Sequence, residues 1–149
     1  MSQPTDDAYL CLDNQVCFSL YSAANAMVRA YRPLLDELDL TYPQYLALLV
    51  LWNNDGISVK LLGEKLRLDS GTLTPLLKRL ESKGLVHRGR SEHDERVRVI
   101  SLTDAGQQLK QQAAQVPQKM FCQLGEDADK LLALKQLCDE LTQKLNAGE

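Results

Sequence analysis

Residues 58–103 constrain the fold of this 149-residue chain more than any other segment. Ser58 is a typical helix N-cap before a short periodic stretch, Val59–Leu66, and Asp69 or Ser70 gives the same signal before a second stretch. The second helix would bury leucines spaced three and four apart, namely Leu73, Leu76 or Leu77, and Leu80. Two short helices joined by about three residues predict a helix-turn-helix.

A small hairpin is expected after the second helix, which Gly84 would end. Two segments have strand patterns, Leu85–Arg90 and Arg96–Leu102, and the loop between them, Ser91–Glu95, is polar. A hairpin in this position is called a wing. The predicted fold is therefore mainly α-helical with a small β-hairpin wing, a winged helix-turn-helix.

Helices are also expected before this segment. Asp13 would be the N-cap of a helix running toward Leu38, and Pro33 would kink or restart it. Thr41 and Gln44 form a capping-box pattern at the start of the next helix.

Further helices should follow the hairpin. Thr103 or Asp104 would cap one that reaches about Gln115, before Pro117 interrupts or kinks it. Apolar residues in the last segment have the alternating spacing of a coiled-coil seam: Leu131, Leu134, Cys138, Leu141 and Leu145. An ordinary amphipathic surface helix would have the same spacing.

The terminal helices are not needed for a winged helix, so they are expected to form a dimer. The predicted organisation is a single domain, 1–149, in which 12–40 and 104–146 form the dimerisation helices and 58–103 is the winged helix-turn-helix region.

The charge of the chain is unevenly distributed. The formal net charge is −3, yet residues 60–98 hold ten Lys/Arg against six Asp/Glu, which makes this segment +4 and the rest −7. A basic middle in an acidic chain indicates a polyanion partner, although a solvated charged face would look the same. No apolar run approaches the roughly 20 residues of a membrane span, and the polar start is no secretory signal, so a cytoplasmic location is expected.

The candidate DNA-binding residues lie on the second helix and the hairpin. Short polar side chains at the start of a helix suit contacts in the major groove, and basic ones further along suit phosphates. The hairpin adds Arg88, Arg90, Arg96 and Arg98, and an arginine at its tip could enter the minor groove, where Asp94 could fix its direction. The predicted DNA-binding set is Ser70, Thr72, Thr74, Lys78, Arg79, Arg88, Arg90, Asp94 and Arg96.

Three stretches of this sequence resemble a known family. The run from Asp94-Glu95-Arg96 to Ser101-Leu102-Thr103 resembles the wing signature of the multiple antibiotic resistance regulator (MarR) family. Residues 12–21, LDNQVCFSLY, and 68–80, LDSGTLTPLLKRL, are similar to the sensing motif and recognition helix of its organic hydroperoxide resistance regulators. The resemblance covers nearly the whole chain.

The resemblance implies a dimeric repressor that an organic hydroperoxide releases from double-stranded operator DNA. The thiolate of Cys17 would be oxidised to a sulfenic acid, with Tyr31 and Tyr42 donating hydrogen bonds to its sulfur. Cys122 matches the resolving position of the two-cysteine members, which implies an intersubunit Cys17–Cys122 disulfide. No cofactor is implied.

The residues themselves are compatible with this chemistry. Cys17 would lie near the start of a helix, whose dipole favours a thiolate, and Tyr21 lies one turn further on. Tyr31 is fourteen residues from Cys17, about 21 Å along a helix, so the two could meet only across a dimer axis. Interface packing is the structural alternative for these tyrosines.

The other cysteines leave alternatives open. Cys11 is a rival partner for Cys17, and Cys138 is expected in the core of the last helix. No cysteine pair has C-x-x-C spacing, and both histidines, His87 and His93, lie far from the cysteines, so no metal site is predicted.

Three rival functions remain. The same fold could respond to a small phenolic ligand bound between the dimerisation and DNA-binding parts. A thiol peroxidase would turn over peroxide with a reductant, but no residues beyond Cys17 point to such an enzyme. A purely dimeric interaction protein would leave the arginines of the hairpin without a role.

Overall fold

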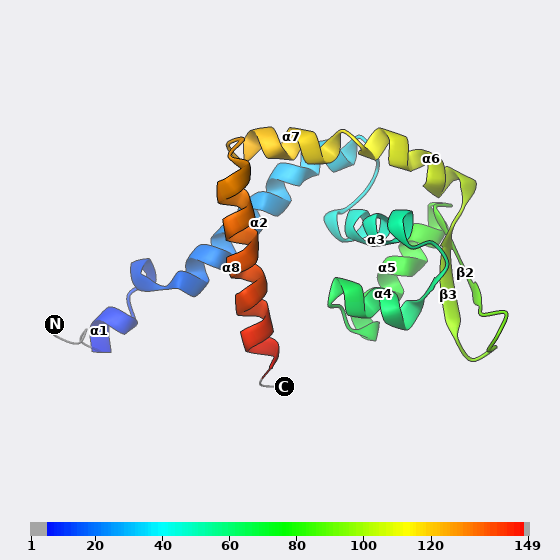
Figure 1. The fold of residues 1–149 in the computed structure, drawn as a ribbon, viewed down its shortest axis with the longest axis horizontal. Helices are drawn as coiled ribbons and strands as arrows, with labels where there is room; N and C mark the ends of the chain where they lie inside the picture. Colours follow the sequence, from blue (N-terminus) through cyan, green and yellow to red (C-terminus); the bar gives the residue numbers. More distant parts are fainter. Residues whose placement is uncertain (1–5, 148–149) are drawn as a thin grey trace. The chain divides into compact units, whose positions relative to one another are not determined.

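The structure is a computed structural model that describes residues 6–147. Its elements, most of them labelled in Figure 1, are α1 (Asp6–Tyr9), the 3-10 helix η1 (Leu12–Asn14), α2 (Val16–Asp36), α3 (Tyr42–Asn53), β1 (Ile57–Ser58), α4 (Val59–Leu66), α5 (Ser70–Ser82), β2 (Val86–Arg90), β3 (Arg98–Leu102), α6 (Asp104–Ala113), α7 (Val116–Gln123) and α8 (Ala128–Asn146). The chain divides into two compact units, one ending at Ala113 and the other beginning at Ala114.

The predicted helix-turn-helix is confirmed, and its caps are visible as hydrogen bonds. Ser58 Oγ accepts from the backbone N–H of Leu61 at 3.0 Å and begins α4, while the Asp69 carboxylate accepts from that of Thr72 at 2.7 Å and begins α5. Arg67, with φ +56°, ends α4 in the left-handed conformation and turns the chain toward α5.

The core of the first unit lies where α3, α4 and α5 gather beside the β2–β3 hairpin (Figure 1). The predicted stripe of α5 is buried, and both alternatives at its centre contribute: Leu73, Leu76, Leu77 and Leu80. Large side chains of the other elements complete it: Leu48, Leu51, Leu62, Val86 and Ile100. Burial of this stripe fixes the opposite face of α5 toward solvent.

The wing belongs to a three-stranded antiparallel sheet of order β1-β3-β2. Both predicted strands are present, but β3 begins at Arg98 rather than Arg96, since the N–H of Val97 bonds the carbonyl of Asp94 at 3.0 Å in a turn. Strand β1 was not predicted, because its two residues are too few to show an alternating pattern.

The prediction of Asp13 as the N-cap of the first long helix is wrong. Asp13 lies in η1, and α2 begins at Val16 with Gln15 as an N-cap residue whose side chain makes no capping bond. The Gln15 amide donates instead to the carbonyls of Tyr9 and Cys11. Pro33 does not restart the helix, which continues through it to Asp36.

The remaining caps agree with the sequence. Thr41 and Gln44 form the capping box of α3. Thr103 Oγ1 accepts from the N–H of Gly106 at the start of α6, which ends two residues before the expected Gln115, and Pro117 lies in the first turn of the separate helix α7.

Helix α8 of the second unit begins at an Asp127 cap and has no buried residue. Most of its leucines are exposed, namely Leu132, Leu134, Leu137, Leu141 and Leu145, and Cys138 is half-buried rather than in a core. In the described part of the chain, no helix is long and apolar enough to cross a membrane.

Candidate redox site and nucleic-acid interface

Cys17 lies in the first turn of α2 with its side chain exposed. The first amide groups of a helix lack partners within the helix, and here no side chain caps them. These N–H groups and the helix dipole place partial positive charge next to the cysteine. The absence of an Asp13 cap therefore leaves the helix start available to Cys17.

Three tyrosines form a cluster between α2 and α3. The ring centroids of Tyr31 and Tyr42 are 4.8 Å apart, and Tyr45 lies 5.8 Å from Tyr31 and 6.4 Å from Tyr42. Burial, with a smaller effect of the neighbouring tyrosines, raises the pKa of Tyr31 to about 12, and burial also raises the pKa of Tyr42 and Tyr45. All three hydroxyls therefore remain protonated hydrogen-bond donors at neutral pH.

The structure brings Tyr31 and Tyr42 together as a pair but keeps Cys17 away from Tyr31 within one chain. Both Cys17 and Tyr31 lie on the continuous helix α2, where fourteen residues span about 21 Å. Tyr21 lies one turn after Cys17 and is 67% exposed.

Cys122 lies near the end of α7 in the second unit and is also exposed. Its pKa is raised, chiefly because the thiol hydrogen-bonds the Glu126 carboxylate, and that negative charge also disfavours a thiolate. Glu126 is held at the C-terminus of α7, because its own backbone N–H donates to the carbonyl of Phe121 at 3.2 Å. Cys122 is thus held as a protonated thiol.

Cys11 is exposed just before η1. Within residues 6–147, no group of three or more His, Cys, Asp or Glu side chains is arranged to hold a metal ion.

Most of the predicted DNA-binding residues of α5 are exposed, in contrast to its buried leucines. Ser70 and Thr72 are exposed in its first turn, Thr74 is half-buried, and Lys78 and Arg79 are exposed further along. Hydrogen bonds from the first turn, chiefly from the Thr72 backbone, lower the pKa of the Asp69 cap. The cap therefore stays ionised and keeps the start of α5 fixed.

Arg96 is held at the tip of the wing by Asp94. One carboxylate oxygen, Oδ1, accepts from the Arg96 backbone N–H at 3.0 Å and from its Nε at 3.3 Å, while the Arg96 side chain stays 91% exposed. The pairing predicted from the sequence is present. It directs an exposed guanidinium rather than burying it.

Arg88 is held differently. Glu81 of α5 accepts from the Arg88 backbone N–H at 3.1 Å and pairs with its guanidinium at 3.3 Å. These bonds to Arg88, led by the one from its backbone, lower the pKa of Glu81. Arg88 therefore joins the hairpin to α5, a role that sequence reasoning did not predict.

The sheet register places two arginines opposite each other, Arg90 on β2 and Arg98 on β3. Like charges directly opposite on neighbouring strands destabilise a sheet unless a counter-ion neutralises them. Nearby, a pocket of about 380 Å³ is lined by Val59, Thr74, Leu77, Lys78, Arg88 and Arg98. α5, the hairpin and the start of α4 thus share one cationic surface.

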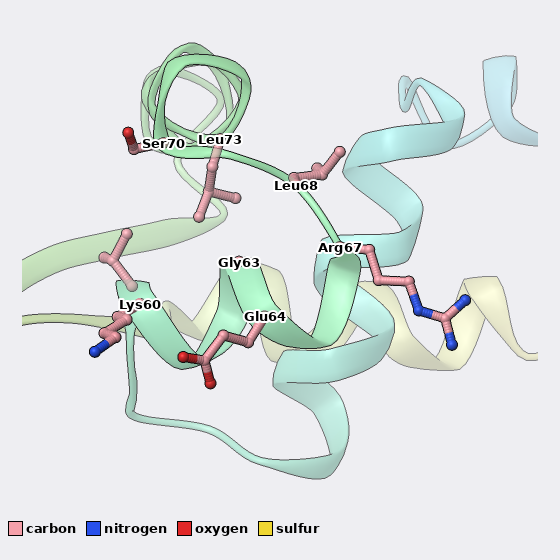
Figure 2. Close-up of a pocket in the computed structure, with 8 residues that line it drawn as sticks. Lys60, Gly63, Glu64, Arg67, Leu68, Ser70 and Leu73 are labelled. Carbon is pink, nitrogen blue, oxygen red and sulfur yellow. The ribbon is translucent and has the colours of Figure 1, made fainter. Parts of the chain in front are cut away.

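A second, open pocket of about 400 Å³ lies in the helix-turn-helix itself, between α4 and the start of α5 (Figure 2). Leu73 points from α5 toward Gly63 of α4. A Cβ on Gly63 would lie 3.1 Å from both the Leu68 carbonyl and the Leu73 side chain, so this glycine permits the close packing of the two helices. Lys60, Glu64, Arg67 and Ser70 are also among the residues that line the pocket.

A third pocket, of about 270 Å³, lies between α2 and the start of α3. Apolar residues make up half of its lining, and Arg32, Asp36, Thr41 and Tyr42 contribute polar groups.

Sequence reasoning missed several residues because their partners are distant in the chain. Tyr45, the third tyrosine, is 3% exposed and looks from its spacing like an ordinary core residue. Lys83 donates to Gln44 Oε1 at 3.0 Å across 39 residues. Nothing in the local sequence signals either contact.

Comparison with known proteins gives consistent relatives. The family model "Transcriptional regulator SarA/Rot" matches residues 29–113. The organic hydroperoxide resistance transcriptional regulator of Bacillus subtilis is 51% identical over 140 residues, which cover 91% of this chain and 95% of the relative.

Solved structures agree. Reduced AbfR bound to DNA has a TM-score of 0.82 at 36% identity, over 96% of this chain and 98% of that one, and AbfR comes from Staphylococcus epidermidis. AbfR with its disulfide formed has a TM-score of 0.63 at 37% identity, over 91% of this chain and 90% of that one. A cysteine-to-serine mutant of Escherichia coli MarR, complexed with operator DNA, has a TM-score of 0.75 at 28% identity, over 82% of this chain and 89% of that one.

These relatives are transcriptional regulators rather than enzymes, and their solved structures share the winged-helix fold of this chain over most of its length. The chain therefore belongs to the MarR family of winged-helix transcriptional regulators, in the branch of the organic hydroperoxide resistance regulators.

Proposed function

We propose that this chain is a cytoplasmic repressor that binds operator DNA as a reduced homodimer and releases it when an organic hydroperoxide oxidises Cys17. The observation that carries the proposal is an exposed cysteine in the uncapped first turn of α2. Such a site combines access for a peroxide with stabilisation of a negatively charged sulfur.

The chemistry takes two steps. The Cys17 thiolate attacks one oxygen of the peroxide, the O–O bond breaks, and an alcohol leaves while Cys17 becomes a sulfenic acid. The Cys122 sulfur of the partner subunit then attacks the sulfenic sulfur, a disulfide forms and water leaves. The exposure of both thiols supports this route, as does the disulfide-formed state of AbfR.

The homodimer is supported by two observations. Apolar side chains are exposed on α2, among them Val16, Phe18 and Val28, and on α8. A second copy would cover such surfaces. It would also bring the Tyr31–Tyr42 pair of one subunit to Cys17 of the other, which the length of α2 forbids within one chain.

Operator binding is supported by the cationic surface. The exposed polar side chains at the start of α5 would enter the major groove, and Arg96 would reach the minor groove. The facing arginines, Arg90 and Arg98, would find their counter-ions in the phosphates.

The test is operator binding in a gel shift, with and without equimolar cumene hydroperoxide, alongside non-reducing gels of the same samples. Wild type should bind when reduced, release the DNA when oxidised, and form a disulfide-linked dimer. Cys17→Ser should bind but never release, and Cys122→Ser should lose the dimer band. Cys11→Ser and Cys138→Ser are matched controls that should behave like wild type.

One observation favours a second candidate, a repressor released by a small phenolic ligand. The pocket between α2 and α3 combines apolar side chains with Arg32, whose charge suits a phenolic anion, and with Asp36, whose charge does not. The same gel shift decides between the candidates, because release that survives Cys17→Ser and follows addition of salicylate would replace the redox proposal.

A further inference from the structure

We propose that Lys83 is a positioning residue that ties the end of α5, the recognition helix, to the tyrosine cluster and carries the oxidation signal between them. The inference rests on the proposed function above. It assigns a role to a lysine that lies outside both the tyrosine cluster and the DNA-binding face.

Lys83 follows the last turn of α5 as its C-cap residue. Its Nζ donates to the backbone carbonyl of Asp39 and to Gln44 Oε1, the latter at 3.0 Å, and lies 3.8 Å from the Asp39 carboxylate. Its side chain is only 28% exposed. One cation thus bridges the recognition helix to the connection between α2 and α3.

Both acceptors lie in segments held by local hydrogen bonds. Asp39 adopts a left-handed conformation with φ +55° just after α2, and the next N–H, from Leu40, bonds back to Leu35 at 3.0 Å. Gln44 is 2% exposed, and the same Oε1 that meets Lys83 also accepts from the Thr41 N–H at 3.1 Å. Lys83 therefore shares an oxygen with the capping box that begins α3.

That capping box also sets the direction of the tyrosines. Tyr42 is the first residue of α3, and Tyr45 follows one residue after Gln44. Tyr31 packs against both rings from α2. A shift of these tyrosines toward or away from an oxidised sulfur would therefore move the start of α3, and with it the acceptors of Lys83.

The lysine contact differs in kind from the packing around it. Apolar contacts between packed helices permit small sliding movements. A charge-assisted hydrogen bond to a buried amide is short and directional, so it is either made or broken. Such a two-state contact can transmit a small displacement to the recognition helix.

The experiment compares Lys83→Met, which keeps the length of the side chain without its donors, with Lys83→Arg and with the exposed control Lys110→Met. Fluorescence anisotropy gives the operator Kd of the reduced and oxidised protein, and non-reducing gels report the disulfide. In Lys83→Met we expect normal disulfide formation but a ratio of oxidised to reduced Kd at least about fivefold smaller than in wild type. Lys83→Arg should restore part of the ratio, and Lys110→Met should keep all of it.

Hydrogen exchange gives a second readout that needs no peroxide. If Lys83 couples the two sites, operator binding to the reduced wild type should change the protection of residues 41–48, and Lys83→Met should abolish this change. An unchanged Kd ratio together with an unchanged exchange response would overturn the role of Lys83. Wild-type protein that binds DNA but ignores peroxide would instead overturn the proposed function, and the exchange response would still decide the role of Lys83.

Discussion

At the scale of single residues, the two candidate sensor cysteines lie in different surroundings. Cys17 lies beside the uncapped amide groups at the start of α2, whereas the hydrogen bond to the Glu126 carboxylate raises the pKa of Cys122. The two thiols are therefore unequal before any oxidant arrives.

The tyrosine cluster leads to a prediction about pH. Tyr31→Phe should slow the oxidation of Cys17 by about tenfold, because a hydrogen bond to a charged sulfur is lost. The raised pKa of Tyr31, about 12, keeps its hydroxyl protonated, so the rate ratio of wild type to variant should stay constant from about pH 7 to 10.

Stopped-flow oxidation with cumene hydroperoxide, followed by thiol titration, measures this ratio, and Tyr9→Phe serves as the control. Equal oxidation rates of wild type and Tyr31→Phe near neutral pH would show that the Tyr31 hydroxyl is not the donor.

At the scale of elements, most of what could be predicted from the sequence depended on local signals. The caps at Ser58 and Asp69 and the capping box of α3 involve residues three apart, so their patterns are readable in order along the chain. The leucine stripe of α5 was predictable for the same reason.

The missed features depend on contacts between distant residues. Ile57 pairs with Ile100 in a strand of two residues, and Lys83 reaches Gln44 across 39 residues. At Asp13, by contrast, a local signal was present but predicted the wrong structure. Asp13 has the right residue type for an N-cap, but it lies within η1, and α2 begins only at Val16.

The Glu81 bond to the hairpin leads to a prediction about pH and stability. The pKa of Glu81 is lowered in the folded protein, so its contribution is present above the unfolded value of about 4.3 and is lost as pH falls through the folded value. Glu81→Gln should therefore lower the melting temperature at pH 7 but have little effect near pH 3.

Circular dichroism melts across this pH range provide the measurement. Glu95→Gln, in the wing loop, is the matched control. If Glu81→Gln lowers the melting temperature equally at every pH, the charge of Glu81 does not contribute to stability.

Gly106 supports a second prediction at this scale. A Cβ there would lie 2.1 Å from the Leu85 backbone carbonyl, which cannot move without disturbing the hairpin, and the Gly106 carbonyl also accepts from Trp52 Nε1 at 2.9 Å. Gly106→Ala should destabilise the protein by about 2–3 kcal/mol. Urea unfolding measures the loss, and the exposed Gln108→Ala should change stability by less than about 0.5 kcal/mol.

At the scale of the whole molecule, the proposal requires two copies of the chain. The exposed leucines of α8 have no cover within the described residues, and the sensor geometry needs a tyrosine pair from a partner. A variant that cannot form the dimer is therefore expected to lose peroxide sensing as well.

A charge placed on α8 tests this. Leu134→Glu combined with Leu141→Glu should convert the protein to its 16.7 kDa monomer, because a carboxylate in an apolar interface is costly. Light scattering after gel filtration reports the mass, and a gel shift should show weakened operator binding. Gln136→Glu, on the same helix, should remain dimeric, and a double variant that stays dimeric would place the interface elsewhere.

The bond between Glu81 and the Arg88 backbone has a consequence for the solubility of the protein. β2 is an edge strand, and exposed edges invite other chains to add strands and aggregate. Glu81 occupies one of its outward N–H groups, and arginines flank the edge with charge. At the opposite edge of the sheet, strand β1 is only two residues long. The wing can therefore approach a nucleic acid at high concentration without becoming a template for fibrils.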